Sequence, residues 1–212
     1  MIIYPYANRQ INKIALTFDD GPNPPNTLKV LDILESYGLK GNFFVLGKWV
    51  KKHPGTVLEM IKRGHLIGNH GYAHLENEPD FETCDQILFK ITGEHPIFGR
   101  PPYCYLSSLK YASQSLLVQQ NKLKLVTFDV DPDDNHLPGS NVILERILKS
   151  TQNGSIIDLH DSSEKEEELM LRPLQMIAIL PQVIEELLKN FQIVRLDEME
   201  LQPLKIEINP DV

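Results

Sequence analysis

Strand-like and helix-like segments alternate along this chain, and this alternation limits the possible folds more than any other feature. Seven short apolar runs rich in β-branched and aromatic residues are predicted as strands, at residues 13–18, 42–46, 65–68, 96–98, 124–128, 155–159 and 192–196. Between them, apolar residues recur with helical spacing at 28–34, 57–61, 142–148 and 179–188. The pattern predicts an α/β fold with a parallel sheet wrapped by helices, either doubly wound or closed into a barrel of about seven strands.

The length of the chain and its lack of internal divisions predict a single domain. Its 212 residues can bury one continuous core, and no repeat or Pro/Gly/Ser-rich linker divides them, so we expect one domain over residues 1–212. The acidic run at 164–168 is predicted to be a solvated loop or the start of a helix. The tail after Met199, which contains two prolines, is predicted to be loosely ordered.

No part of the sequence has the composition of a membrane span or of a signal peptide. The apolar runs fall short of about 18 residues, and the first residues lack a basic segment followed by an apolar one. We therefore expect no membrane span. The compartment stays open between the cytoplasm and, where a leader has been removed, secretion.

The net charge of −8 argues against a nucleic-acid partner. Phosphate binding needs Lys and Arg gathered on one face, and the basic residues here form no block. A neutral or cationic substrate suits such a chain better, although moderate acidity also simply maintains solubility. Cys84 and Cys104 lack a metal-binding spacing and are predicted to be thiols, with a single disulfide as the alternative.

Polar residues cluster at or just past the ends of the predicted strands. In parallel α/β folds these ends converge on one face, so residues far apart in sequence can share one pocket. Four other histidines lack such a setting and are interpreted as surface or loop residues: His53, His65, His95 and His136. The residues predicted to gather at the strand ends are Asp19, Asp20, His70, His74, Arg100, Asp131, Asp134 and His160.

The first motif, TFDDGP at residues 17–22, places two adjacent carboxylates at the end of a strand. The Gly-Pro pair forces a turn, so both acids lie at the mouth of the strand. If one carboxylate binds a cation, the positive charge lowers the pKa of its neighbour and keeps it ionised as a base at neutral pH. A solvated Asp-Asp-Gly turn is the simpler interpretation of this hexapeptide taken alone.

The second motif, NHGYAH at residues 69–74, places two histidines four residues apart after a predicted strand. This spacing is about one helical turn and lets both rings bind one metal. The HExxH zinc-protease interpretation fails because position 71 is Gly, so a base must come from elsewhere. With Asp19 and Asp20 available, we predict a site of two histidines and one carboxylate that leaves a position open for water.

Three further motifs follow: GRPPY at 99–103, DVDPDDN at 129–135 and SIIDLHD at 155–161. His160 follows an apolar run and should lie at the end of a strand. That position suits a general acid that protonates a leaving amine.

Together these motifs make the chain similar to the NodB-homology polysaccharide deacetylases, which form carbohydrate esterase family 4. All five motifs occur in the order of that family, and they define a deacetylase core at about 13–197. TFDDGP matches the family pattern, and HGYAH keeps both histidines, with Gly71 and Ala73 in place of the usual hydroxyl residues. The resemblance implies a distorted barrel of seven or eight β/α units.

The resemblance also implies a metal site. Asp20, His70 and His74 would hold one divalent cation, most often Zn²⁺, with Co²⁺ or Mn²⁺ as alternatives. Asp19 would be the base that takes a proton from the attacking water.

Four more residues receive roles from the same resemblance. Arg100 would pair with Asp19 and hold it in place. The backbone N–H of Tyr103 would help to stabilise the oxyanion. Asp134 would hydrogen-bond His160 and raise its pKa, so that His160 is protonated when the amine departs.

Two positions depart from the family pattern. The fourth motif usually ends in Asp-Trp, whereas Asn135 follows Asp134 here, so an aromatic wall of the acetyl pocket is missing. The fifth motif is usually Leu-x-His, whereas Asp158 stands two residues before His160. A carboxylate beside the acetyl methyl group is costly if it is buried without a partner. Either this side chain turns away, or the pocket accepts something other than a plain acetamide.

The resulting hypothesis is metal-dependent hydrolysis of N-acetyl groups from an amino-sugar polysaccharide or oligosaccharide, with release of acetate. The substrate would be an acetylated carbohydrate of chitin type or the N-acetylglucosamine of peptidoglycan. One alternative is a carbohydrate-binding protein on the same scaffold with weak or lost activity. The other is a hydrolase of small amides or O-acetyl esters, such as an acetylxylan esterase.

Overall fold

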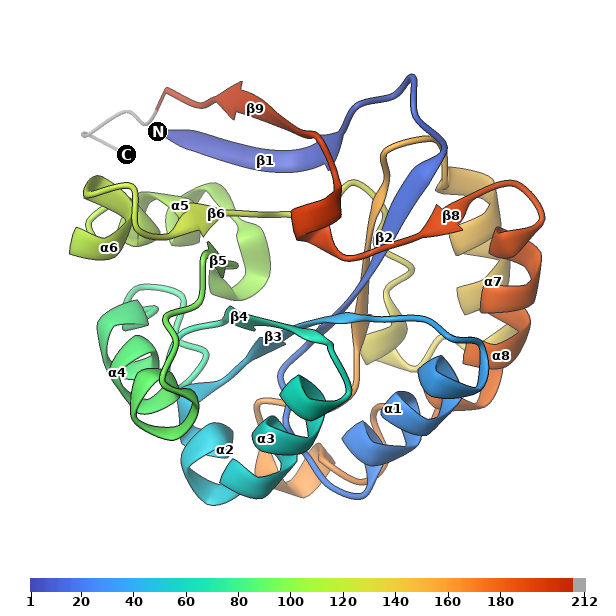
Figure 1. Ribbon diagram of the computed structural model, residues 1–212, viewed down its shortest axis with the longest axis horizontal. Coiled ribbons are helices and arrows are strands. Elements are labelled where there is room, and N and C mark those ends of the chain that lie inside the picture. The colour runs from blue at the N-terminus through green and yellow to red at the C-terminus, as the bar shows by residue number, and fades with distance from the viewer. Residues whose placement is uncertain (208–212) are drawn as a thin grey trace.

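The computed structural model describes residues 1–207, and its centre is a curved parallel sheet of seven strands (Figure 1). The order of six strands is β6-β5-β4-β3-β2-β7, and β8 also pairs with β2. The predicted distorted β/α barrel is confirmed, and each predicted strand contributes to it. The strands are β2 (Lys13–Asp19), β3 (Asn42–Val45), β4 (Leu66–Asn69), β5 (Phe98–Gly99), β6 (Lys124–Leu125), β7 (Ile156–His160) and β8 (Gln192–Ile193).

Helices surround the lower and outer sides of the sheet in Figure 1. The four predicted helical segments fall within α1, α3, α7 and α8. The other α-helices, α2, α4, α5 and α6, were not predicted from the sequence. The α-helices are α1 (Asn26–Ser36), α2 (Gly47–Lys52), α3 (Pro54–Lys62), α4 (Phe81–Thr92), α5 (Leu106–Ala112), α6 (Leu116–Gln119), α7 (Ser140–Ser150) and α8 (Leu174–Leu188). Short 3-10 turns are η1 (Pro102–Cys104), η2 (Asp134–His136), η3 (Glu166–Glu168) and η4 (Leu196–Glu198). Within residues 1–207, no helix is both long and apolar enough to cross a membrane.

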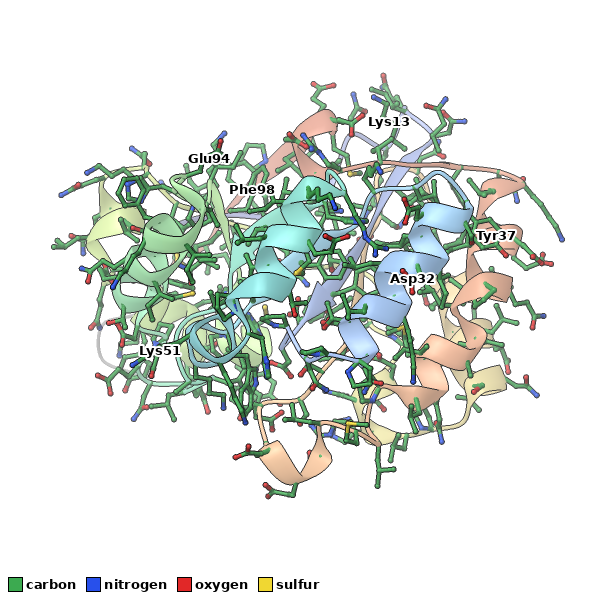
Figure 2. All side chains as sticks on the ribbon, turned by 60° about the horizontal axis from the view of Figure 1, so that its bottom comes forward. Lys13, Asp32, Tyr37, Lys51, Glu94 and Phe98 are labelled. Atoms are coloured by element: carbon green, nitrogen blue, oxygen red, sulfur yellow. The ribbon has the colours of Figure 1, made fainter. Side chains whose placement is uncertain are left out.

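The main hydrophobic core lies between the sheet and helices α1, α3, α7 and α8. Leu16 and Phe18 of β2 are fully buried in it, as are Ile143 and Ile147 of α7, which lie one helical turn apart. Figure 2 shows α1 and α3 side by side in front of the sheet, with Asp32 labelled on α1. Apolar side chains therefore occupy one face of each element, which explains why the helical spacing in the sequence was informative.

A second, two-stranded sheet joins the two ends of the described chain. β1 (Ile2–Ala7) pairs antiparallel with β9 (Leu201–Lys205), and the two strands lie side by side at the top of Figure 1. The expectation of a loosely ordered tail after Met199 was therefore wrong for residues 201–205, while residues 208–212 lie outside the described part. β9 forms because it pairs with β1, which lies about two hundred residues earlier in the chain. No local sequence pattern therefore predicts this strand.

Three of the four histidines interpreted as surface or loop residues lie in partly or fully exposed positions, but His65 does not. His65 is only 5% exposed and precedes β4, where its Nδ1 accepts a hydrogen bond from the backbone N–H of Gly41 at 2.9 Å. His65 is therefore a loop residue, as the interpretation allowed, but it does not lie at the surface. Cys84 and Cys104 are free thiols, as predicted.

The strand register brings the polar residues to one edge of the sheet. On β2 and β7, Thr17 lies opposite Asp158 and Asp19 lies opposite His160. Side chains alternate along a strand, so Thr17 and Asp19 share one face while Leu16 and Phe18 point into the core. The carboxyl ends of these strands and of β4 together form the floor of the candidate site.

Candidate active site

Asp20, His70 and His74 converge at this edge of the sheet. One ligand atom from each lies within 4.8 Å of the others, and all three residues are buried. Asp20 Oδ1 lies 3.6 Å from His70 Nε2 and 3.5 Å from His74 Nε2, yet it has no hydrogen-bond partner. Two ligands of a tetrahedral zinc ion, each at about 2.1 Å, lie about 3.4 Å apart. The donor set and the unpartnered oxygen therefore fit a divalent metal, and the ligand roles themselves stay a prediction.

The orientation of His70 is fixed from its other side. Its Nδ1 lies 2.8 Å from the backbone carbonyl oxygen of Arg100, so Nδ1 carries the proton and Nε2 keeps its lone pair. Burial lowers the pKa of His70 well below its usual value, and the nearby His74 lowers it further. The ring is therefore neutral, which is the form that binds metals.

The two histidines converge through a bend, and not through the helical turn that their spacing indicated. Residues 70–74 form no helix, and His74 has a left-handed backbone with φ 62°, as does Asp20 with φ 71°. Gly71 makes the bend possible: its φ is 80°, and an added Cβ would lie 1.9 Å from the carbonyl oxygen of Pro79. Such strained positions cluster at functional sites.

Arg100 holds one carboxylate oxygen of Asp19, and the other oxygen faces His70. Arg100 Nη1 donates to Asp19 Oδ1 at 2.9 Å, while Asp19 Oδ2 lies 3.5 Å from His70 Nε2. The structure thus places Arg100 against Asp19, as the resemblance implied. Burial raises the pKa of Asp19 to about 6, and Arg100 opposes this shift. A carboxylate with such a pKa is ionised at neutral pH and is still basic.

Asp158 does not turn away from the site. Its Oδ1 accepts from Arg100 Nη1 at 2.7 Å, so a single guanidinium nitrogen contacts both Asp19 and Asp158. Burial and the neighbouring Asp19 raise the pKa of Asp158 well above its usual value. The first of the two alternatives for this side chain is therefore wrong.

His160 and Asp134 form the pair that the resemblance implied. His160 Nδ1 lies 2.8 Å from Asp134 Oδ1, and the backbone N–H of His160 donates to Asp134 Oδ2 at 2.9 Å. Burial alone would lower the pKa of His160, but the charge and hydrogen bond of Asp134 raise it well above its usual value. The ring can therefore carry a proton in the pocket at neutral pH.

Tyr103 lies beside His74 on the short turn η1. Its φ is 61°, and its ring packs edge-on against His74 with centroids 4.5 Å apart. Within residues 1–207, its backbone N–H has no hydrogen-bond acceptor. An unpaired N–H at this position can donate to a substrate oxygen.

Most of these residues line a cavity of about 420 Å³, whereas Arg100 and Asp134 lie behind its wall. Several residues at its rim were not predicted from the sequence, among them Tyr105, Glu164 and Arg172. Tyr105 stacks on Tyr103 and follows the RPPY motif closely, a signal that could have been used. Glu164 belongs to the acidic run expected to be solvated, but it is half-buried and pairs with Arg172 at 3.2 Å. No local pattern predicts that contact.

Comparison with known proteins agrees with this geometry. The family profile described as polysaccharide deacetylase matches residues 7–120. The chain belongs to the polysaccharide deacetylase family. A peptidoglycan-N-acetylglucosamine deacetylase of Bacillus cereus is 33% identical to this chain over 84% of the chain and 82% of its own length. A chitooligosaccharide deacetylase of Rhizobium leguminosarum bv. trifolii is 34% identical, over 76% and 77%.

Another relative matches this chain over only part of its own length. The peptidoglycan-N-acetylmuramic acid deacetylase PdaC of Bacillus subtilis is 35% identical over 70% of the chain, which spans only 32% of that relative. Among solved structures, the Bc1960 peptidoglycan N-acetylglucosamine deacetylase superposes with a TM-score of 0.80 at 29% identity. That match covers 92% of this chain and 91% of the other, so the two proteins share the barrel over nearly their whole lengths.

Proposed function

We propose that this protein hydrolyses N-acetyl groups of an amino-sugar polymer or oligomer and releases acetate. The observation that carries the proposal is the convergence of Asp20, His70 and His74 between Asp19 and His160. The names of the relatives support an N-acetylglucosamine substrate of peptidoglycan or chitin type.

Asp20, His70 and His74 would hold the metal, for which Zn²⁺ is the first candidate and Co²⁺ or Mn²⁺ are the alternatives. When bound, a divalent cation supplies the positive charge that polarises the amide carbonyl and makes a water molecule more acidic. Two imidazoles and one carboxylate form a ligand set that is typical of catalytic zinc.

Asp19 is the residue we propose as the general base. Its Oδ1 is held by Arg100, so its Oδ2 is free to take a proton from the attacking water. The buried Arg100 lies between the rings of Phe44 and Phe128, at 4.2 and 5.3 Å from their centroids. This packing keeps the carboxylate in one orientation throughout the reaction.

His160 is the residue we propose as the general acid. An amide nitrogen is a poor leaving group unless it gains a proton, and the pair with Asp134 keeps a proton on His160 at neutral pH. The backbone N–H of Tyr103 would donate to the carbonyl oxygen as negative charge develops there.

The test is release of acetate from N-acetylglucosamine oligomers by the zinc-loaded protein. Asp19→Asn should lower kcat about 100-fold or more, because the base is lost while the side chain keeps its shape. Asp32→Asn on the surface of α1 is the control with the same change of charge. No release from any N-acetyl substrate, together with turnover of acetylxylan, would favour the esterase alternative. Glycan binding without any acetate release would favour a binding protein.

A further inference from the structure

Asp158 is a buried carboxyl group that the proposed mechanism does not use. Arg100 does not need it, because Nε and Nη2 donate to the carbonyl oxygens of Val126 and Thr127. The two hydrogens of Nη1 have three acceptors within reach, at 2.8 Å for Thr17 Oγ1, 2.9 Å for Asp19 Oδ1 and 2.7 Å for Asp158 Oδ1. Both hydrogens of Nη1 would therefore keep an acceptor without Asp158, so this side chain needs another explanation.

The second oxygen of Asp158 meets the cavity. Within residues 1–207, Oδ2 has no hydrogen-bond partner, and it is not among the fully covered polar atoms. The Asp158 side chain is 6% exposed and lines the pocket, so the small exposed part faces the substrate space. Once a substrate displaces water from the pocket, an Oδ2 without a hydrogen-bond partner becomes costly. The occupant of the pocket is therefore expected to offer Oδ2 a hydrogen bond.

The strand register indicates which part of the substrate reaches Asp158. On β7, Asp158 lies two residues before His160 on the same face, so it is one step deeper than the acid. In the proposed function, the amide nitrogen faces His160 and the carbonyl oxygen faces the metal ligands and the N–H of Tyr103. The third substituent of the carbonyl carbon is the rest of the acyl group. It then points toward the floor of the cavity, which Asp158 and Phe128 line.

We propose that Asp158 makes the floor of the pocket select an N-acyl group with a hydroxyl on the carbon next to the carbonyl, an N-glycolyl group, over N-acetyl. The inference rests on the proposed function and specifies its substrate. A hydroxyl both donates and accepts, so it can pair with Oδ2 whether Asp158 is ionised or protonated. A methyl group can do neither and leaves the oxygen unpaired.

The chemistry needs no additional reactant. Water adds its oxygen to the acyl carbon, the C–N bond breaks, and the nitrogen leaves with a proton from His160. The products are glycolate and a free amino sugar, and nothing is oxidised or reduced.

The test compares matched oligomers that carry N-glycolyl or N-acetyl groups. The ratio of kcat/KM for glycolate release to kcat/KM for acetate release should be about 10 or more in the wild type, because a site built around a hydroxyl rejects the analogue that lacks it. Asp158→Leu should reverse the preference. Asp158→Asn should keep a preference for N-glycolyl, because an amide still forms hydrogen bonds. Asp32→Asn, which makes the same change of charge on the surface of α1, should leave the ratio at the wild-type value.

A purely structural role for Asp158 predicts a different result for the ratio of the two kcat/KM values. If Asp158 only supports Arg100, both substrates lose the same factor in Asp158→Leu and the ratio does not change. That result, or a wild-type preference for N-acetyl, would overturn the inference. Thermal unfolding of each variant shows whether the barrel is intact, and Asp158→Asn covers the case in which the Leu variant does not fold.

A binding measurement tests the role of Asp158 even when the proposed function fails. If the wild type hydrolyses neither substrate, the proposed function fails, and titration calorimetry with glycolate and acetate on the zinc-loaded protein still tests the pocket. The glycolate hydroxyl can also chelate zinc, but it does so equally in Asp158→Leu. The preference for glycolate should therefore fall at least 5-fold in that variant, and an equal preference in both proteins would refute the role of Asp158.

Discussion

Two histidines at opposite ends of the sheet are almost equally buried, yet their surroundings favour opposite charges. His160, at the carboxyl end, is 9% exposed and pairs with Asp134, and the pKa of its ring is raised well above the usual value although burial opposes this. His65, at the amino end, is 5% exposed and has a backbone N–H as its partner, and burial lowers its pKa to about 4. Burial therefore does not decide the charge of a histidine here; its partner does.

The same contrast extends to the residues around each histidine. At the carboxyl end, Asp19, Asp158 and Arg100 are ionisable groups enclosed together. At the amino end, the buried polar group beside the strands is the neutral amide of Asn42, which donates to the carbonyl of Leu16 and accepts from the N–H of Leu196. The carboxyl end thus encloses several ionisable groups together, whereas His65 and Asn42 at the amino end are neutral at pH 7.

The largest expected effect comes from the backbone that shapes the carboxyl end. Gly71→Ala places a Cβ against the carbonyl oxygen of Pro79 at a left-handed φ, so it should lower the free energy of unfolding by about 3 kcal/mol or more and weaken zinc binding. The control is Gly93→Ala, where φ is 78° but no atom lies within 4 Å of the new Cβ. It should cost about 1–2 kcal/mol and leave zinc affinity unchanged. Urea unfolding measures the stability of the two variants, and zinc titration measures their affinity for zinc. Equal effects of the two substitutions would contradict the account.

Removal of the carboxylate that pairs with His160 should shift the pKa of this ring toward that of His65. Asp134→Asn removes the charge that raises the pKa of His160, so less of the ring is protonated and kcat should fall about 100-fold. Asp133→Asn is the matched control, because Asp133 also pairs with a histidine, His136, but both side chains are largely exposed. Its effect on kcat should be less than about 3-fold. NMR titration of the histidine rings would follow the pKa directly, and an unchanged pKa of His160 in Asp134→Asn would contradict the comparison.

A smaller effect is expected at the amino end, as a dependence of stability on pH. His65 has a folded pKa of about 4, below its unfolded value of 6.5, so the folded state binds a proton less readily. Its contribution to stability is complete above pH 6.5 and is lost as the pH falls toward 4, by about 1–3 kcal/mol. His65→Asn keeps an acceptor for the N–H of Gly41 and does not titrate. Urea unfolding from pH 7 to 4 should therefore give a steeper loss for the wild type, and parallel curves would contradict the account.

The smallest effect is expected where charges face solvent. Asp32 pairs with Arg63 at 2.6 Å, but its side chain is 67% exposed. Asp32→Asn should change the free energy of unfolding by no more than about 0.5 kcal/mol. A change of several kcal/mol in the free energy of unfolding, measured with urea, would contradict the expectation that exposed charge pairs contribute little to stability.

The sequence predicted those parts of the site that local motifs specify. TFDDGP and NHGYAH identified the residues that the structure brings together around Asp20, and the apolar runs located all seven strands of the main sheet. The contacts that need distant partners were not predictable. The pairing of β1 with β9, the burial of His65 and the contact between Arg100 and Asp158 each depend on segments that meet only in the folded chain.

Zinc binding by single-residue variants tests the central claim most directly. Metal-free protein would be titrated with Zn²⁺ by calorimetry, and bound metal would be counted after dialysis, for the wild type, Asp20→Asn and Asp19→Asn. The account predicts one zinc per chain in the wild type, a loss of at least about 100-fold in affinity for Asp20→Asn, and affinity within about 10-fold of wild type for Asp19→Asn. A wild-type chain that binds no zinc, or an Asp20→Asn variant that binds it as tightly, would contradict the proposed site.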